Sequence, residues 1–355
     1  MTENPSESTN GRRPTIRHVA QRAGVSKSLV SLVLRDAPQV SKDKREAVLR
    51  AMGELGYQPN AAARSLGEQR TRAVGVLLND LRNPWFVDLL DGLHSVLYAH
   101  GLHMLLGDGR MNRQTDESLI RMFTEMRVDG LVLVGMMPIS AAVAEIAGRV
   151  PTVMTGSREV ELPRVDTIAN DDRRGGELAV QHLLDLGHTR IAHIAGWGAV
   201  GRLRQQAYEA TMRTAGLQDH IRVEPGDLTE EGGYRATVRL LSRGQAPTAI
   251  FASNDMSCIG AQSAADELGI ATPGELSLVG YDNTYLAQLR HLWLTSVDGA
   301  NHEIGQRAGR TLLTRIEHPD RPATLQLVAP SLQIRTSTAP QPSTASPPTN
   351  PPMTA

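Results

Sequence analysis

From Arg72 onward the chain alternates short apolar runs with longer amphipathic stretches, and this alternation most limits what it can fold into. Short runs of β-branched and aliphatic residues are typical of buried strands, and the stretches between them carry helical spacing. Strands that alternate with helices predict doubly wound parallel sheets, covered by helices on both faces. There are more strands than one sheet comfortably holds. The sequence therefore predicts two similar α/β lobes with a cleft between them.

The predicted strands are Val74–Leu78, His103–Leu106, Leu131–Val134, Thr152–Met154, Arg190–Ile194, Ile221–Glu224, Thr248–Ala252 and Leu276–Val279. The predicted helices of this region include Val87–Ala99, Glu117–Met126, Gly175–Leu186, Arg202–Thr214, Tyr234–Leu241, Ser257–Leu268 and Ile304–Ile316.

Length and composition indicate a soluble protein of two or three folded units. The chain has 355 residues, of which 40% are hydrophobic, enough for a core in each unit. No apolar run approaches the ~18 residues of a membrane span, and the N-terminus lacks the pattern of a signal peptide. Cys258 is the single cysteine, so no internal disulfide can form. We expect a cytoplasmic protein without a membrane partner.

The charge of the chain is unevenly distributed. Residues 12–72 carry a net charge of +8, and the rest of the chain carries −9. A basic head on an acidic body favours a polyanionic partner that binds the head alone. Charge alone does not exclude the alternative, in which the basic face of the head is simply solvated and binds no partner.

The head itself is predicted to be helical. Residues 1–13 are polar and without periodicity, so we expect them to be disordered. Thr15 is placed to cap a helix over 16–23, Ser26 a helix that ends at Leu34, and Ser41 a helix that ends near Leu55. Residues 14–57 are therefore expected to form a helix-turn-helix with a supporting third helix, a unit of the size that enters a DNA major groove.

Residues 58–72 are expected to form a hinge helix and a linker. Pro59 ends any preceding helix, Asn60 can cap a new one, and three alanines follow. The segment from Tyr57 to Leu66 is shorter than the ~12–15 residues that an isolated helix needs in water. It should fold only against a partner, which makes it a candidate switch between head and body.

Two motifs in this order resemble the head and hinge of the lactose-repressor/galactose-repressor (LacI/GalR) family of transcription regulators. The first is Thr15-Ile16-x-x-Val19-Ala20-x-x-Ala23-Gly24-Val25-Ser26-x-x-x-Val30-Ser31-x-Val33-Leu34, and the second is Gly56-Tyr57-x-Pro59-Asn60-x-x-Ala63-Arg64-x-Leu66. The resemblance implies a homodimer on a double-stranded, pseudo-palindromic operator. Recognition helices would enter two major-groove half-sites, and paired hinge helices would occupy the minor groove between them.

The same resemblance implies which residues contact DNA. Lys27, Ser28 and Leu32 would face bases, Ser31 and Asn60 the backbone, and Leu66 would wedge into the central base step. The full implied set is Thr15, Ser26, Lys27, Ser28, Ser31, Leu32, Tyr57, Asn60, Ala63 and Leu66.

Three head residues depart from the family pattern. His18 stands where the family usually has Asp, and Leu29 where it usually has Thr. Leu32 stands where a polar, base-contacting residue such as Arg is common. A leucine cannot make the bidentate contact of Arg to guanine, so Leu32 should favour an apolar contact such as a thymine methyl. For Leu29 a place in the core is the preferred interpretation.

For residues 73–335 the resemblance implies the type I periplasmic-binding-protein fold, with an effector-binding and dimerisation role. The chain would cross between lobes near Ala169, Val297 and Arg321. Residues 336–355, rich in Pro, Ser and Thr, are expected to be disordered. They contain no leucine heptads, so a dimer is the simplest assembly.

A ligand site is expected in the cleft, because parallel sheets bind ligands beyond the carboxyl ends of their strands. Polar residues follow several strands, and all three tryptophans fall in flanking loops. A buried tryptophan often belongs only to the hydrophobic core. Three tryptophans in loops that flank strands instead favour an aromatic-lined pocket for a sugar or related polyol. The resemblance places Arg204, Asn254 and Asp282 on effector hydroxyls, with a surface ion pair as the alternative. The expected effector-binding residues are Asp80, Trp85, Phe86, Trp197, Arg204, Asn254 and Asp282.

Gly299 stands where many relatives have Gln, which argues against a close copy of the lactose or galactose pocket.

One rival interpretation concerns the run from Gly196 to Gly201, which matches Gly-x-Gly-x-x-Gly after a strand and has Glu224 at the end of the next strand. That context is the one required of a dinucleotide site, and would make the body an NAD(H) sensor or a dehydrogenase. Trp197 is bulky where the backbone must approach a pyrophosphate, so we prefer the regulator. Motifs of zinc enzymes, P-loops and serine hydrolases are missing from the sequence, and we expect no catalytic residue, metal or cofactor.

Overall fold

The computed structural model describes residues 14–58, 70–109, 116–135, 140–156, 158 and 162–341. The chain separates into two compact units, Met1–Thr71 and Arg72–Ala355, and each is described by itself. No helix among the described residues is long and apolar enough to span a membrane.

Residues 14–58 of the head form three helices, α1 (Ile16–Arg22), α2 (Lys27–Leu34) and α3 (Lys42–Leu55). Their bounds confirm the predicted helix-turn-helix and third helix, except that α1 ends one residue earlier. Val19, Val30 and Val48 are fully buried at the centre of the head. Ser26 caps α2 as expected, because its Oγ accepts the Leu29 N–H at 3.2 Å.

His18 takes part in the start of α1. Its Nδ1 accepts the backbone N–H of Thr15 at 3.2 Å, which satisfies a donor that the helix itself leaves open. A histidine therefore fills the capping role at this position, where the related pattern has Asp.

The body has two separate sheets, as predicted, and each has six strands among the described residues. The sheet of lobe 1 is parallel in the order β11-β5-β4-β3-β1-β2, and that of lobe 2 runs β12-β10-β9-β8-β6-β7 with only β12 antiparallel to its neighbour. Lobe 1 contains β1 (Ala73–Leu78), β2 (His103–Asp108), β3 (Gly130–Val134), β4 (Thr152–Thr155), β5 (Asp166–Asn170) and β11 (Leu325–Val328). Lobe 2 contains β6 (Ile191–Ala195), β7 (Arg222–Pro225), β8 (Ala249–Ala252), β9 (Ser277–Tyr281), β10 (Thr295–Asp298) and β12 (Ser331–Gln333).

Helices cover both faces of each sheet, and each face has its own apolar cluster. In lobe 1 the helices are α5 (Trp85–Ala99), α6 (Asp116–Glu125), α7 (Ala141–Ala147) and α12 (Asn301–Glu317). In lobe 2 they are α8 (Asp172–Asp185), α9 (Gly198–Thr214), α10 (Glu230–Ser242) and α11 (Asp255–Glu267), with short 3-10 turns at Gln218–His220 and Tyr285–Gln288. The predicted doubly wound architecture is confirmed.

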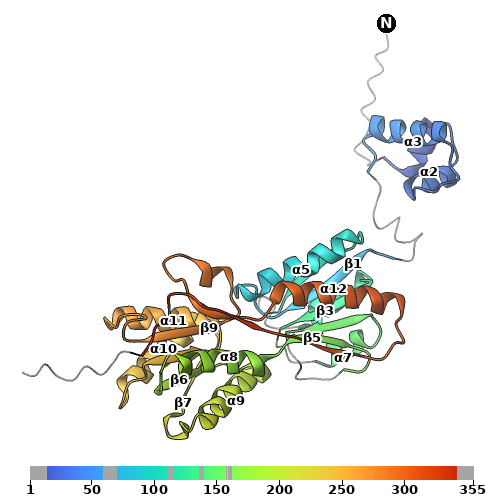
Figure 1. The fold of residues 1–355 in the computed structure, drawn as a ribbon. Helices are drawn as coiled ribbons and strands as arrows, with labels where there is room; N and C mark the ends of the chain where they lie inside the picture. Colours follow the sequence, from blue (N-terminus) through green and yellow to red (C-terminus); the bar gives the residue numbers. More distant parts are fainter. Residues whose placement is uncertain are drawn as a thin grey trace, which may run out of the picture. The chain divides into compact units, whose positions relative to one another are not determined.

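Helices α5 and α12 lie side by side on lobe 1 (Figure 1). They approach closely because glycines face the partner backbone. A Cβ on Gly92 would lie 2.0 Å from the carbonyl oxygen of His302, and one on Gly305 would lie 2.0 Å from that of Leu89. Helix α12, which comes near the end of the sequence, therefore packs directly against α5, the first helix of the body.

The chain crosses between the lobes three times. The first two crossings, after Asn170 and after Asp298, agree with the positions expected from the resemblance. The third was expected near Arg321 but lies between β11 and β12, at residues 329–330. Arg321 cannot make the crossing because its Nη2 donates to Asp166 of β5 at 2.6 Å, which holds it in lobe 1 until β11 has joined that sheet.

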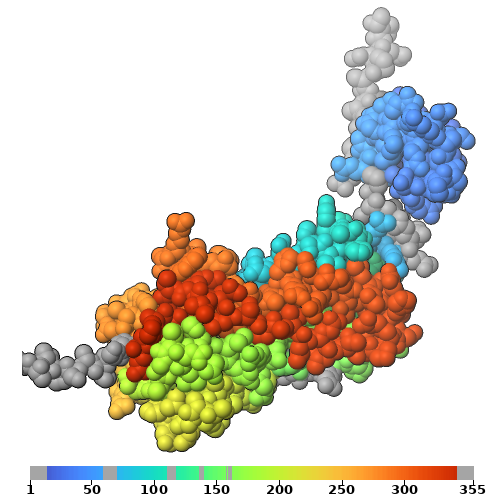
Figure 2. Space-filling view, in the orientation of Figure 1, coloured from blue at the N-terminus to red at the C-terminus, as the bar shows by residue number. Residues whose placement is uncertain are grey.

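The expected disordered tail from residue 336 is wrong for its first six residues, which pack on lobe 2. Ser337 is buried, and its Oγ donates to the carbonyl of Leu278 at 2.7 Å and accepts the N–H of Thr295 at 2.8 Å. His188 Nε2 lies 3.0 Å from the carbonyl of Ala339. In the space-filling view the deepest red marks this end of the chain on lobe 2 (Figure 2).

Candidate functional site

The surface of α2 is the first candidate site. Lys27 and Ser28 are exposed on its first turn, and Ser31 and Leu32 are partly buried one turn later. Leu29 packs against the core of the head, as its preferred interpretation required. Exposed polar side chains on the first turn leave α2 able to contact an external partner.

The other expected DNA contacts are spread around the head or lie outside the described residues. Thr15 is exposed at the start of α1, and Tyr57 packs against the head core after α3. Asn60, Ala63 and Leu66 of the proposed hinge fall in residues 59–69, outside the described part of the chain.

The second candidate site is a cavity between the carboxyl ends of the two body sheets. Its lining includes all seven residues expected at the effector site: Asp80, Trp85, Phe86, Trp197, Arg204, Asn254 and Asp282. The other lining residues were not in the expected effector-binding set: Asn79, Asn83, Gly135, Gly156, Asn170, Val200, Asp227, Leu228, Thr229 and Ile304. Asn170 is the last residue of β5, and Asp227 lies two residues after β7, just as Asp80 and Asn254 lie two residues after β1 and β8.

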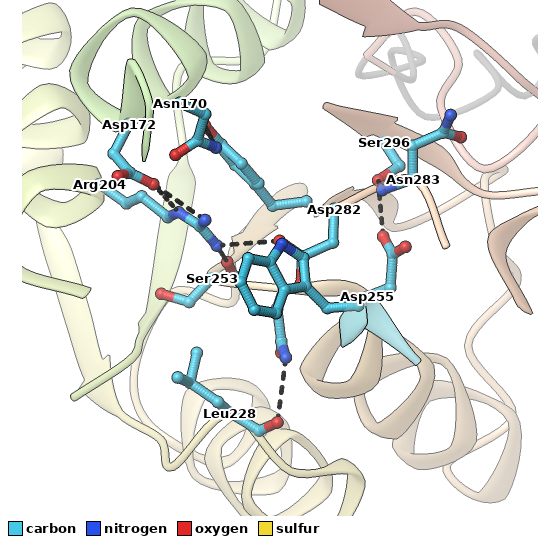
Figure 3. A network of polar contacts seen from close by, with 12 residues as sticks. Asn170, Asp172, Arg204, Leu228, Ser253, Asp255, Asp282, Asn283 and Ser296 are labelled. Atoms are coloured by element: carbon cyan, nitrogen blue, oxygen red, sulfur yellow. Dashed lines mark hydrogen bonds and ion pairs between the residues drawn. The ribbon is translucent and has the colours of Figure 1, made fainter. Parts of the chain in front are cut away.

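Arg204 is the central charge of this cavity and is almost fully buried. Its Nη2 lies 2.9 Å from Oδ1 of Asp172, and its Nη1 lies 3.5 Å from Oδ1 of Asp282. Nη1 also donates to the carbonyl of Ser253, and the guanidinium stacks 3.5 Å from the ring centroid of Tyr281. Figure 3 shows Arg204 reaching from α9 toward Asp172 on one side and Asp282 on the other. One guanidinium therefore serves two buried carboxylates.

Burial disturbs the ionisation of these groups. It raises the pKa of Asp282 to about 8, although Arg204 acts in the opposite direction. Burial likewise raises the pKa of Asp172 against the attraction of Arg204. Burial alone would lower the pKa of Arg204, but the two carboxylates outweigh it and the net shift is upward. Such perturbed groups in a cleft are typical of ligand sites.

Asn170 extends the network from β5. In the orientation of its amide that satisfies both neighbours, the NH2 group donates to Asp172 at 3.1 and 3.2 Å and the carbonyl accepts from the Tyr281 hydroxyl at 3.1 Å. A Cβ on Gly299 would lie 2.8 Å from the end of the Asn170 side chain. A larger residue at position 299 would therefore press on the Asn170 amide.

A second polar chain joins the two lobes. The indole Nε1 of Trp85 donates to Oδ1 of Asn301 at 2.8 Å, and Nδ2 of Asn301 donates to the backbone carbonyl of Asp282 at 2.9 Å. Trp85 begins α5 and Asn301 begins α12, both in lobe 1, whereas Asp282 follows β9 of lobe 2. Asp282 has a positive φ of 96°, a strained backbone conformation for a residue other than glycine. The hydrogen bond from Asn301 is made to the carbonyl of this strained residue.

Asp255 holds the loop that carries Asp282 through hydrogen bonds. Its carboxylate accepts the Ser296 hydroxyl at 2.6 Å and the Thr284 N–H at 2.7 Å, as Figure 3 shows for Ser296. Burial raises the pKa of Asp255 to about 6 against these hydrogen bonds. The loop that presents Asp282 is thus anchored to the start of α11.

The glycine-rich run has a packing explanation in the structure. A Cβ on Gly201 would lie 2.3 Å from the carbonyl carbon of Gly196, so the loop closes tightly on the helix. Glu224, which would bind a ribose on the dinucleotide interpretation, instead pairs with Arg239 and lies 3.8 Å from Arg243. The geometry of this loop therefore gives no support to a dinucleotide site.

The chain is similar to known proteins in both of its units. A family model described as "Bacterial regulatory proteins, lacI family" matches residues 15–60, and one described as "Periplasmic binding protein-like domain" matches residues 180–338. The "HTH-type transcriptional repressor PurR" of Erwinia tasmaniensis is 33% identical over 331 residues, which cover 92% of this chain and 97% of the relative. The chain belongs to the LacI family of bacterial regulatory proteins.

Two solved LacI-family structures are similar over most of the chain. One, titled as the Lac repressor dimer bound to operator and the anti-inducer ONPF, is 28% identical with a TM-score of 0.82 and covers 92% of this chain and 100% of that chain. The other, titled as the transcriptional regulator CelR–cellobiose complex, is 30% identical with a TM-score of 0.68 over 92% and 100%. The fold of this LacI-family regulator thus comprises a DNA-binding head and a ligand-binding body.

Proposed function

We propose that the chain is a sequence-specific repressor that binds a pseudo-palindromic operator as a homodimer. The exposed first turn of α2, with Lys27 and Ser28, and the +8 charge of residues 12–72 support DNA binding by the head. The similar structure of a Lac repressor dimer on its operator supports two copies on one site.

The repressor is controlled by a small effector, a sugar or related polyol, bound in the cavity between the lobes. The observation that carries this proposal is that seven residues expected from the sequence, four from lobe 2 and three from lobe 1, line one cavity. Trp85 and Trp197 offer indole faces to the apolar C–H surfaces of a sugar ring. The similar CelR structure contains cellobiose.

An effector that contacts both lobes can alter how they close on each other. The link from Trp85 through Asn301 to Asp282 is the contact that such a change would disturb. A coupling free energy of roughly 1–3 kcal/mol between cavity and head would change operator affinity about 5–150-fold.

The test begins with operators selected from random duplexes by the full-length protein. Fluorescence anisotropy would then measure affinity from about 50 to 200 mM salt, where counterion release predicts a steep fall. Adding a panel of sugars at fixed salt should reveal one that changes the affinity. Binding that is insensitive to salt, or selected duplexes without a repeated half-site, would contradict the proposed repressor.

A further inference from the structure

The turn at residues 281–284, here called the Asp282 turn, carries Asp282 from the end of β9 to the wall of the cavity. Asp282 has a φ of 96° and Asn283 has a φ of 49°. Asparagine tolerates the left-handed region, but an aspartate at 96° is in a strained backbone conformation. Such strain persists only where the surrounding structure holds the backbone. The contacts of the Asp282 turn therefore decide where its carboxylate points.

Lobe 2 holds the N–H groups of this turn. The N–H of Asp282 donates to the carbonyl of Val297 at 2.8 Å. The N–H of Asn283 donates to the hydroxyl of Ser296 at 3.0 Å, and the next N–H along the turn donates to Asp255 at 2.7 Å. All three acceptors belong to β10 or α11. The N–H side of these peptide planes is thus fixed within lobe 2.

The carbonyl side of the central peptide is held from lobe 1. Nδ2 of Asn301, the first residue of α12, donates to the Asp282 carbonyl at 2.9 Å. The peptide plane between residues 282 and 283 therefore has a hydrogen bond to each lobe, because its carbonyl accepts from Asn301 and its N–H donates to Ser296. A movement of one lobe against the other must break one of these bonds or rotate the peptide.

The amide of Asn301 is itself fixed by a second partner. Its Oδ1 accepts Nε1 of Trp85 at 2.8 Å, and the residue is buried. Rotating the amide by half a turn would place a donor against the indole N–H and an oxygen against the carbonyl, so both partners require the same orientation. Trp85 and Asp282 are among the described residues that line the cavity, and Asn301 is not. Asn301 therefore joins two cavity residues of different lobes without lining the cavity itself.

The surroundings leave Trp85 and Asn301 little freedom. A Cβ on Gly156 would lie 2.4 Å from Cη2 of Trp85, so the indole lies directly against the backbone of lobe 1. A Cβ on Gly299 would lie 3.1 Å from Oδ1 of Asn301. Helices α5 and α12, which begin at Trp85 and Asn301, pack closely together. The indole and the amide should therefore move with lobe 1 as one unit.

We infer that Asn301 is a positioning residue for the cavity, which orients the indole of Trp85 and, through the Asp282 carbonyl, keeps the Asp282 turn in its strained conformation. When lobe 1 moves relative to lobe 2, the bond to this carbonyl is lost and the turn relaxes. The direction of the Asp282 carboxylate then changes with the position of the lobes. The inference rests on the proposed function only where it concerns operator affinity, and its first two measurements need neither operator nor effector.

A pair of substitutions measures the strain in the full-length protein. Asp282→Gly and Asp282→Ala both remove the carboxylate, but only glycine adopts a φ of 96° without strain. Relative to Asp282→Ala, the melting temperature of Asp282→Gly should be lower by roughly 2–8 °C in an Asn301→Leu background than in the parent background. Leucine fills the space of asparagine but bonds to neither partner, and the entropy that glycine adds to the unfolded chain cancels between backgrounds. An equal difference in both backgrounds would show that lobe 2 alone holds the turn, and would overturn the inference.

The indole of Trp85 gives a second measurement, which a merely structural role of Asn301 would not move. Full-length protein labelled with 15N in tryptophan gives an indole N–H signal for each of its three tryptophans, and Trp85→Phe identifies the signal of Trp85. Asp282→Gly, a change in lobe 2, should shift this signal by several linewidths in the parent and much less in the Asn301→Leu background. Thr229→Ala changes the same cavity from lobe 2 without a contact to this chain of residues, and should not shift it. A Trp85 signal that responds to Asp282→Gly equally with and without Asn301 would contradict the inference.

Operator affinity tests the regulatory consequence, with duplexes selected by the parent protein. Trp85→Phe and Asn301→Leu should change the affinity in the same direction, and the double variant should match Asn301→Leu alone, because both act through one chain of hydrogen bonds. Additive changes, or unchanged affinity in both single variants, would overturn the role of Asn301 in regulation. Failure of the parent to select any duplex would instead contradict the proposed repressor, while the melting and indole measurements would still decide whether Asn301 positions the turn.

Discussion

Arg204 of α9 is held by Asp172 of α8, with 2.9 Å between Nη2 and Oδ1. The sequence pointed to Arg204 as a group that grips an effector. The structure adds that the guanidinium is fixed by the protein, so its first role is to balance two buried carboxylates. A ligand would meet a preorganised cluster rather than a mobile arginine.

Replacing Arg204 should therefore destabilise the body. Arg204→Ala leaves the Asp172 carboxylate buried without its cation, and breaking a buried pair in this way typically costs about 3–5 kcal/mol. Denaturant unfolding followed by tryptophan fluorescence measures it, because all three tryptophans lie in the body.

The matched control is Arg213→Ala on the same helix. Arg213 pairs with Glu209 one turn away near the surface of the helix. Breaking this pair should lower the free energy of unfolding by less than about 1 kcal/mol. Equal losses in the two variants would show that the buried cluster has no special importance for stability.

The stability of the body should depend on pH through Asp282. Its pKa is raised to about 8 by burial, with Arg204, Asp172, Asp255 and Tyr281 as the neighbouring groups. The folded protein therefore binds this proton more tightly than the unfolded chain, so the contribution is full at low pH and is lost as pH rises through about 8. Asp282→Asn lacks the titrating group, and relative to the parent it should gain stability between pH 6 and pH 9.

Unfolding free energies of parent and variant, measured at several pH values, decide this point. Titrating groups outside the cluster of Arg204, Asp172 and Asp255 are common to both proteins and cancel in the difference. A difference that stays constant across the range would mean that Asp282 is ionised throughout, and that its burial is better compensated than the geometry indicates.

The ordered start of the C-terminal segment gives a third prediction. Deleting residues 336–355 removes the two hydrogen bonds of Ser337, the N–H of Ala339 to Ser277 Oγ at 3.1 Å, and the N–H of Gln341 to the carbonyl of Leu186 at 2.9 Å. At about 0.5–1.5 kcal/mol for each of these four hydrogen bonds, we expect the free energy of unfolding to fall by about 2–6 kcal/mol.

Deleting only residues 342–355 keeps all of these contacts and serves as the control. Thermal melting of both truncated proteins is the measurement. If both deletions lower the melting temperature equally, residues 336–341 contribute nothing and their packing is incidental.

The architecture was predictable because hydrophobic periodicity dominates it. All eight predicted strands are present, since runs such as Val74–Leu78 are fully apolar and buried on both faces. Four short strands were not predicted. β5 and β10 are polar at several positions, and β11 and β12 have only four and three residues, so all of them depend on their neighbours in the sheet.

Helix starts were predicted less well than helix ends. α9 begins at Gly198, four residues before the predicted start, because glycines are poor helix formers and gave no indication of a helix. The same limit applies to Asp172. Its pairing with Arg204 joins two helices, and no local pattern in the sequence reveals such a contact.

The segment 336–341 shows how composition can mislead. Pro, Ser and Thr favour disorder when they have no partners. Here His188 offers both ring nitrogens, with Nδ1 2.9 Å from Thr248 Oγ1 and Nε2 3.1 Å from Ser277 Oγ, and the segment completes this network at Ala339. Its order comes from tertiary hydrogen bonds that the sequence does not display.

The last prediction concerns base recognition by α2. Leu32 is partly buried, one turn after the exposed Ser28, and a leucine can offer a base only an apolar contact. Leu32→Arg would supply a bidentate donor pair for guanine, worth about 1–3 kcal/mol of discrimination at one base pair. Operators selected by the variant should change to G·C at one position of each half-site. Leu49→Arg, the same change on the exposed surface of α3, should select the parent sequence. If the Leu32→Arg protein also selects the parent sequence, Leu32 does not face a base and α2 contacts DNA through a different set of residues.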